Sequence, residues 1–347
     1  METKMLLKSK PSTARCNELM YINFLLSDPN NATCTRLSEI LETVSHDSIN
    51  RFLHRERFTP KDLFDSEKEK IELNGGTLSV DDTVIDKPYS DISKSELIGT
   101  YWSGKHKKIV KGINLITLFY TDIQGVSVPV NFRIYDKRED KTKNDYFLEM
   151  LDESLTWGLK PSWVTGDSWY ASTGNLKKIR RLNLNFLFGI EQNRCVSIER
   201  GQYIQVQKLE DWSQGSVEAY LKNYGMVKVF RQVYKNTYRY YIMGMADLNN
   251  LDGIKQIDFE RVHNSHWHVE RYHRATKQVC NIERFQVREE NAIKNHLYCA
   301  LKAFVCLEIS RFSKVIENWY QIKRNLFIKV IRDFITSHPE NMQDVNA

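Results

Sequence analysis

The sequence predicts a mixed α/β protein: a helical region comes first, a largely buried sheet with flanking helices follows, and a β-rich insertion interrupts that core. Three observations predict this fold class. Residues 1–73 have helical spacing of apolar side chains, whereas strand-like and helix-like segments alternate between residues 77 and 190. Residues 192–262 alternate as β-strands do, with glycines between the runs. From residue 263 onward the pattern is helical again, which predicts a return to the core and a helical C-terminal tail.

The composition is that of a folded protein with a mild positive charge. With 347 residues, of which 41% are hydrophobic, the chain can bury one large core or two to three modest ones. The net charge of +6 permits nucleic-acid binding without demonstrating it. No run approaches the ~18 apolar residues of a membrane span, and no export signal is evident. The six cysteines lack C-x-x-C pairs, which predicts reduced thiols of an intracellular protein.

The helical region contains a pattern that suggests DNA binding. Two short helices are predicted over residues 35–41 and 47–53, with Ser45 or Asp47 as the cap of the second. Arg51 and Arg55 make this second helix basic, so residues 47–55 are a candidate reading helix of a helix-turn-helix. Helical pairs of this kind are common, and the pattern alone leaves DNA binding open.

The core is predicted from a change of periodicity after residue 73. Residues 77–83 form a short strand that ends in two carboxylates, Asp81 and Asp82. Residues 109–121 are almost continuously apolar, as in a buried central strand, and a turn joins them to residues 126–135 as a hairpin. Further elements are predicted in the order helix 144–157, strand 162–165, basic helix 175–182 and strand 185–190. Antiparallel pairing followed by crossovers is therefore expected.

Residues 263–277 predict a helix with one polar face. That face carries His263, His266, Glu270, Arg274 and Lys277, and the opposite face, which includes Val269 and Tyr272, can pack. An isolated polar stripe is more often a solvated surface than a site. Residues 291–312 predict an apolar helix that seals the sheet, and residues 313–335 predict a basic amphipathic helix before a frayed end.

Carboxylates occupy three positions from which they can converge. Asp81 or Asp82 closes the first strand, Asp167 closes the fourth, and Glu270 lies on the helix after the sheet. Oxygen ligands with open positions suit Mg²⁺ or Mn²⁺, and two such ions can activate a water or a 3′-OH for attack on a phosphodiester. Each aspartate alone is weak evidence, because aspartate often ends a strand for turn reasons. The pattern does not decide between Asp81 and Asp82.

These segments resemble bacterial insertion-sequence transposases of the DDE class, in which a β insertion interrupts an RNase H-like (retroviral integrase-like) catalytic core. Asp81 and Thr83 match the family's Asp-x-Ser/Thr pattern, which favours Asp81, and Asp167 with Tyr170 matches its Asp-x-x-Tyr pattern. The resemblance covers roughly residues 35–310.

The third motif of the family, Tyr-x2-Arg-x3-Glu-x6-Lys, is the most specific. Glu270 and Lys277 fit its spacing, whereas His263 and His266 stand at its Tyr and Arg positions. His266 can keep part of an arginine's role as a donor, but it is charged only when protonated, near pH ~6.5.

The resemblance implies that Asp81, Asp167 and Glu270 ligate two Mg²⁺ ions per active site, with Mn²⁺ as a substitute. It implies a cut-and-paste reaction on double-stranded DNA: cleavage at terminal inverted repeats, a hairpin intermediate, and strand transfer into target DNA. A homodimer in the DNA complex and a place in the bacterial cytoplasm, at the nucleoid, also follow from it. The expected DNA contacts are Lys277, His266, His263, Arg274, Lys105, Lys107, Lys108, Arg51 and Arg55.

A base-stacking aromatic is also implied in the insertion. Tyr240 is the first candidate, ahead of Tyr241 and Trp212, although an aromatic that packs the sheet would have the same sequence pattern. The predicted parts are a helical DNA-binding region (1–73), the core (74–191 and 263–312), the insertion (192–262) and a basic helix with the tail (313–347).

Three other interpretations fit parts of the sequence. A zinc site could draw on His263, His266, His268 or His273, but no second His/Cys pair stands at ligand spacing. A transposase-derived DNA-binding repressor would not need the three carboxylates. A structure-specific nuclease on the same core would lack the helical region and the insertion.

Overall fold

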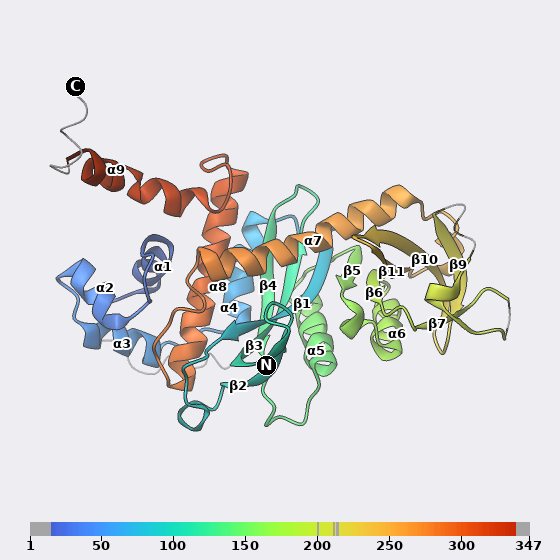
Figure 1. Cartoon of the computed structure of the whole chain (residues 1–347), viewed down its shortest axis with the longest axis horizontal. Coiled ribbons are helices and arrows are strands. Elements are labelled where there is room, and N and C mark those ends of the chain that lie inside the picture. The colour runs from blue at the N-terminus through green and yellow to red at the C-terminus, as the bar shows by residue number, and fades with distance from the viewer. Residues whose placement is uncertain (1–14, 200, 211, 213–214, 338–347) are drawn as a thin grey trace, which may run out of the picture. The chain divides into compact units, whose positions relative to one another are not determined.

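The computed structural model describes residues 15–199, 201–210, 212 and 215–337 (Figure 1). Within this part the chain divides into two compact units. The sheet unit comprises residues 60–88 and 97–273, and the helical unit comprises the described residues before 60, residues 89–96, and those from 274 onward. No helix in the described part of the chain is both long and apolar enough to cross a membrane.

The sheet unit contains the mixed sheet that the sequence predicts. Its first strands are β1 (Thr77–Asp86), β2 (Gly99–Ser103), β3 (Lys108–Thr121), β4 (Ser127–Ile134), β5 (Trp163–Gly166) and β6 (Asn185–Ile190). Strand β1 is antiparallel to β3 on one side and parallel to β5 on the other, and β5 is parallel to β6. Strand β4 pairs with β3 as the predicted hairpin. The fold class is confirmed: this is an RNase H-like arrangement.

The strands of the predicted insertion continue the same sheet. They are β7 (Cys195–Ser197), β8 (Ile204–Gln205), β9 (Ser216–Leu221), β10 (Gly225–Tyr234) and β11 (Thr237–Gly244). Strand β11 pairs antiparallel with β6, with Tyr240 opposite Ile190, so that the sheet has the order β2-β3-β1-β5-β6-β11-β10-β9-β7-β8. The insertion therefore extends the core sheet rather than forming a layer of its own.

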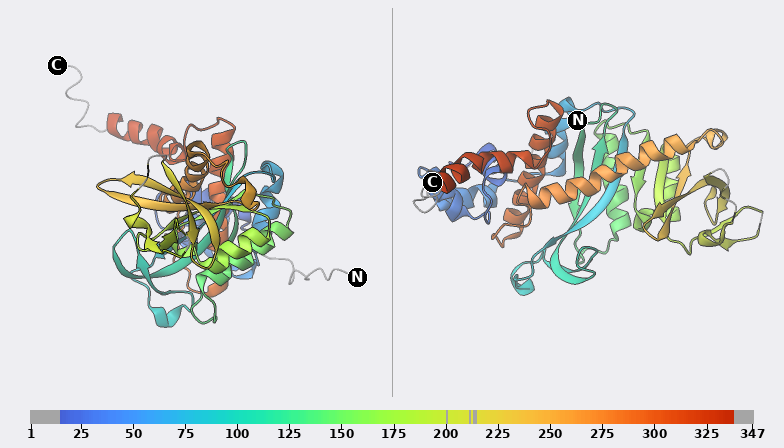
Figure 2. Two further views of the ribbon diagram at one scale, coloured as in Figure 1. Left: turned by 90° about the vertical axis from the view of Figure 1, so that its right-hand side faces the viewer. Right: turned by 45° about the horizontal axis from the view of Figure 1, so that its top comes forward.

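Helices flank this sheet. They are α4 (Pro60–Glu67), α5 (Lys143–Thr156), α6 (Thr173–Arg181) and α7 (Gln256–Gln278), with short 3-10 turns η1 (Lys68–Lys70), η3 (Ser168–Tyr170), η4 (Val206–Lys208) and η5 (Leu248–Asn250). A capping box begins α5, because Thr142 and Asp145 satisfy each other's backbone N–H groups. Helix α7 runs across the sheet, as the right-hand view of Figure 2 shows. Its apolar face is buried as predicted, and Tyr272 stacks on Phe119 at 4.8 Å.

Three boundaries differ from the sequence-based expectation. Strand β1 continues to Asp86, so Asp81 and Asp82 lie within the strand rather than at its end, because β3 supplies pairing partners as far as Gly112. Strand β2 was not predicted; its five residues are too few to show an alternating pattern. Helix α7 starts at Gln256 rather than near residue 263, because Phe259 and Val262 already pack into the core beneath it.

The helical unit is built from α1 (Glu18–Ser27), α2 (Cys34–Leu41), α3 (His46–Arg55), η2 (Ile92–Lys94), α8 (Glu290–Phe312) and α9 (Gln321–Ser337). Ser45 caps α3, which decides between the two predicted caps. Helix α8 packs against α1 and α3: the Tyr21 hydroxyl lies 2.9 Å from His296 Nδ1, and Asn295 donates to Leu53 O at 2.6 Å. Helix α8 thus belongs to the helical unit, where its buried polar groups hydrogen bond with the N-terminal helices, and its predicted role in sealing the sheet stays a prediction.

All six cysteines are free, and they differ in exposure. Cys16, Cys280 and Cys299 are buried, whereas Cys306 is exposed. Burial raises the pKa of the Cys16 thiol to about 12, so this group is a neutral thiol at neutral pH.

Candidate active site

The register of two parallel strands brings Asp81 and Asp167 together. Val80 of β1 is paired with Gly166, the last residue of β5. Asp81 directly follows Val80, and Asp167 directly follows Gly166. Two residues earlier, Ser79 Oγ and Thr165 Oγ1 are 2.8 Å apart. Because side chains alternate along extended backbone, both aspartates lie on the same face of the sheet as this Ser–Thr pair.

Helix α7 covers that same face and carries Glu270. His266 Nδ1 lies 3.1 Å from Thr165 Oγ1, and His273 Nε2 lies 3.5 Å from Asp81 Oδ2. Glu270 is four residues after the first histidine and three before the second, so all three share one helix face. Glu270 and Asp167 also line the same cavity. Asp81 and Asp167 are thus neighbours on the face that α7 covers, and Glu270 adjoins the cavity beside Asp167.

Asp82 lies on the opposite face of the sheet, where other side chains donate hydrogen bonds to it. It accepts hydrogen bonds from Lys143 Nζ at 2.7 Å, from Asn114 Nδ2 at 2.7 Å and from the Tyr170 hydroxyl at 3.0 Å. Lys143 comes from α5 and Tyr170 from the turn after Asp167. The geometry therefore separates the two neighbouring aspartates that the sequence pattern left open: Asp82 belongs to an ion-paired network, and Asp81 faces Asp167 and α7.

The electrostatics of the α7 face favour a bound cation. Asp167 is solvent-exposed but lies in a hollow where it loses hydration; this desolvation, with the charges of Asp81 and Asp82, raises the pKa of Asp167 to about 7. Burial also acts to raise the pKa of Asp81, but the hydrogen bond and charge of His273 outweigh it and leave this pKa below its ordinary value. The raised pKa of Asp167 thus reflects lost hydration first and the two neighbouring carboxylates second, and a bound cation would offset both.

His266 and His263 do not act as cations here. Burial lowers the pKa of His266 to about 4, so the imidazole is neutral at neutral pH and does not replace the positive charge of the family's arginine. Burial and the charge of Arg239 also lower the pKa of His263, whose Nε2 lies 3.2 Å from the Tyr241 hydroxyl. Both histidines connect α7 to the sheet.

The donor set fits a hard divalent cation better than zinc. Asp81, Asp167 and Glu270 offer only oxygen atoms, which suit Mg²⁺ or Mn²⁺. His268 faces Ser127 Oγ at 3.0 Å, so the four histidines of the proposed zinc site point to four different partners. Over the described ranges, no group of three or more His, Cys, Asp and Glu side chains is already arranged as a metal site.

The cavity beside the carboxylates has a volume of about 730 Å³. Its walls come from the ends of β5 and β6, from the β10–β11 hairpin and from α7. Tyr240 lines it but is only 6% exposed and packs 6.0 Å from Trp212, whereas Tyr238 and Trp267 line it with about half of each side chain exposed. Sequence reasoning did not single out Trp267, although it stands three residues before Glu270 on the same helix.

The remaining predicted DNA contacts lie in other places. Lys105 and Lys107 lie in the turn between β2 and β3, and Lys108 begins β3, all within the sheet unit. The others, Arg51, Arg55, Arg274 and Lys277, belong to the helical unit. Lys277 pairs there with Glu283 at 3.1 Å.

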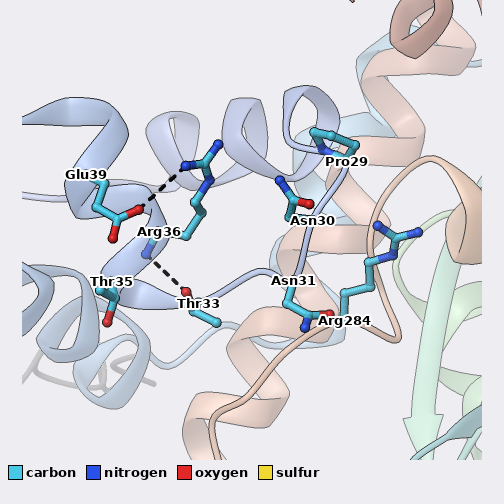
Figure 3. Close-up of a pocket in the computed structure, with 8 residues that line it drawn as sticks. All are labelled: Pro29, Asn30, Asn31, Thr33, Thr35, Arg36, Glu39 and Arg284. Atoms are coloured by element: carbon cyan, nitrogen blue, oxygen red, sulfur yellow. Dashed lines mark hydrogen bonds and ion pairs between the residues drawn. The ribbon is translucent and has the colours of Figure 1, made fainter.

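The helical unit has a cavity of its own, about 570 Å³ in volume, beside the start of α2 (Figure 3). Arg36 extends along it and pairs with Asp28 at 2.8 Å and with Glu39 at 3.5 Å. Thr33 caps α2 by accepting from the backbone N–H of Arg36. Arg36 is therefore already paired with the acidic side chains around it, and the hydroxyl of Thr33 is used as the helix cap.

The fold and the acidic face together define an RNase H-like transposase core. The sequence matches the family described as the transposase DDE domain over residues 74–306, and the chain belongs to that family. The match includes Asp81, Asp167 and Glu270 and stops short of α1, α2 and α3.

Known structures agree with this fold. The chain is similar to piggyBac transposase in a synaptic complex with hairpin DNA, with a TM-score of 0.53, 12% identity, and coverage of 98% of this chain and 76% of the other. Weaker likenesses are to Drosophila P element transposase in a strand transfer complex (TM-score 0.27, 10% identity, 55% and 48% coverage) and to Bacillus subtilis endonuclease V (TM-score 0.28, 9% identity, 60% and 84% coverage). A search of curated proteins found no match to this sequence.

Proposed function

We propose that this protein is the transposase of a bacterial insertion sequence. It binds the terminal inverted repeats of its own element, cleaves DNA strands there with divalent metal ions, and joins the freed 3′ ends to target DNA. The observation that supports the proposal is that Asp81 and Asp167 share the sheet face that α7 covers, and that Glu270 of α7 lines the same cavity as Asp167, while the adjacent Asp82 is ion-paired on the other face.

In this proposal Asp81, Asp167 and Glu270 hold two Mg²⁺ ions, for which Mn²⁺ can substitute. Bound ions of this kind activate the attacking water or 3′-OH and stabilise the leaving oxygen of the phosphodiester. The other residues of the site position these carboxylates. Asp82, with Lys143 and Tyr170, fixes β1 and the turn after Asp167 from the far face of the sheet.

DNA contacts complete the proposal. Lys277 and Arg274 would bind phosphates near the scissile bond, and Lys105, Lys107 and Lys108 would bind phosphates of a longer duplex. Arg51 and Arg55 on α3 would contact the terminal repeat. His263 and His266 would act by holding α7 in place, since the pKa of each is lowered.

A hairpin intermediate and a dimer on DNA are also part of the proposal. The cavity next to Asp167 has the aromatic walls that an unpaired base requires, with Tyr240 at its inner side and Tyr238 and Trp267 exposed. The piggyBac structure, which has the same fold, is a synaptic complex with hairpin DNA. Joining two element ends requires at least two copies of the chain if each holds one end.

The test uses a labelled duplex that carries the terminal repeat of the element. Wild type, Asp167→Ala and Glu270→Ala are incubated with it in Mg²⁺ or in EDTA, and the products are separated on a denaturing gel. We expect metal-dependent cleavage at the repeat, lost in both variants while their gel shift persists. Binding without cleavage in Mg²⁺ and Mn²⁺ would refute the proposal in favour of a repressor, and cleavage that ignores the repeat would indicate a structure-specific nuclease.

A further inference from the structure

Strands β2 and β3 form a two-stranded ribbon that extends beyond the end of β1. Gly112 of β3 is paired with Asp86, the last residue of β1. Strand β3 begins four residues earlier, at Lys108, and these residues are paired with β2. Lys105 and His106 in the connecting turn contact Asp86 at 3.4 and 2.7 Å, which ties the tip of the ribbon to the end of β1.

The two faces of this ribbon differ. On the inner face Tyr101 is buried, with its hydroxyl donating to Tyr135 O at 3.1 Å. On the outer face Trp102 and Ile109 are directly opposite each other in the ladder, and they are 65% and 68% exposed. The outer face therefore presents a paired tryptophan and isoleucine to the solvent, which is an unusual arrangement unless something binds there.

The charge around this apolar pair indicates the kind of partner. Lysines follow at positions 105, 107, 108 and 111, and no Asp or Glu occurs between Leu97 and Thr121. Lys107 and Lys108 make no ion pair within the described part of the chain. A second copy of this chain would bring the same positive charge against itself, whereas a polyanion is complementary to it.

We propose that the outer face of the β2–β3 ribbon is a binding surface for duplex DNA. A two-stranded ribbon fits the major groove, which is about 12 Å wide. Trp102 and Ile109 contact the apolar edges of bases and sugars in the groove, and Lys107 and Lys108 bind phosphates on its rim. This inference rests on the proposed function and deepens it: the ribbon holds duplex outside the cavity of Asp167 and Glu270, without dependence on the terminal repeat.

The test measures the affinity of the full chain for a labelled duplex of unrelated sequence, in EDTA, over a series of salt concentrations. One variant combines Lys107→Ala with Lys108→Ala, and a second combines Trp102→Thr with Ile109→Thr. The matched control combines Lys160→Ala with Lys208→Ala, which removes the same charge from two exposed lysines elsewhere in the sheet unit. Because the substituted side chains are exposed, we expect all variants to keep the wild-type circular dichroism spectrum and melting temperature.

We expect the lysine variant to lower the slope of log affinity against log salt by about two, because each of the two lysines neutralises one phosphate in the wild-type complex. The Trp–Ile variant should weaken binding about tenfold at every salt concentration and leave the slope unchanged. The control should bind as wild type does. Wild-type affinity for the duplex in both ribbon variants would overturn the inference. It would also be overturned if the Trp–Ile variant bound the duplex normally and differed from wild type only in being a monomer where the DNA-free wild type is a dimer.

The outcome separates this inference from the proposed function. If wild type never cuts its terminal repeat but the ribbon variants lose affinity for duplex, the proposed function fails and the ribbon remains a DNA-binding surface. If wild type cuts the repeat and the ribbon variants bind unrelated duplex normally, the proposed function stands and the ribbon inference fails.

Discussion

Asp81 and Asp82 are neighbours on β1 with opposite surroundings. Asp82 receives three hydrogen bonds on the α5 face, one of them from the ammonium group of Lys143. Asp81 lies on the α7 face, where the pKa of its neighbour Asp167 is raised to about 7 by desolvation and by the two nearby carboxylates. Asp82 is thus neutralised by a lysine for structure, whereas on the α7 face Asp167 remains desolvated and close to like charges. Removing charge should have opposite effects on the two faces.

The largest expected effect is on strand cleavage. Glu270→Gln keeps the size of the side chain but removes a charge from the proposed metal site, and we expect the cleavage rate to fall by about 1,000-fold, roughly 4 kcal/mol of transition-state stabilisation. Glu260→Gln is the matched control, because Glu260 is an exposed carboxylate on the same helix. Rates are measured with the terminal-repeat duplex in Mg²⁺. Equal rates for the two variants would remove Glu270 from the proposed site.

The next effect is on stability, with opposite signs on the two faces. Asp82→Asn weakens the bonds to Lys143 and Tyr170, and we expect the free energy of unfolding to fall by about 2 kcal/mol, as for a hydrogen bond to a charged group. Asp167→Asn removes a disfavoured charge, so in EDTA it should raise the free energy of unfolding. Urea denaturation measures both. Stabilisation by Asp82→Asn, or destabilisation by Asp167→Asn, would contradict the contrast between the faces.

The sequence predicted the sheet better than it predicted the surroundings of the site. Alternation and apolar runs located β3, β4, β5 and β6 because these patterns are set by burial along a single segment. Family spacing found Asp81, Asp167 and Glu270, but only pairing between β1 and β5 shows that the aspartates adjoin. The network of Asp82 joins residues that are up to 88 positions apart, so no local pattern reveals it. The same holds for the low pKa of His266, which arises because the imidazole is buried between α7 and the sheet.

A third prediction concerns pH. The pKa of Asp167 is higher in the folded protein, about 7, than its ordinary value of 3.8, so the folded state binds more protons between these values. In EDTA the contribution of Asp167 to stability therefore decreases as pH rises from about 4 to 7. Urea denaturation of wild type and Asp167→Asn at pH 5 and pH 8 isolates this effect: the variant should gain stability relative to wild type at the higher pH. Mg²⁺ should reduce that gain, because a cation favours the ionised carboxylate. A gain that is equal at both pH values would mean that Asp167 does not titrate in this range.

The smallest effect should come from the anchor of α7 above the carboxylates. Thr165→Val removes the hydroxyl that lies between Ser79 and His266, and we expect a loss of about 1 kcal/mol of stability. Cleavage should also fall by a few-fold, because His266 is one turn from Glu270 and sets its position over Asp167. Ser127→Ala, which removes the partner of His268, serves as the comparison, since it loosens α7 through a histidine that faces away from the carboxylates. If both variants lose stability but only Thr165→Val loses cleavage activity, then cleavage depends on the position of α7 as well as on the three carboxylates. If the two variants cleave equally well, Glu270 is positioned by the apolar packing of α7 alone.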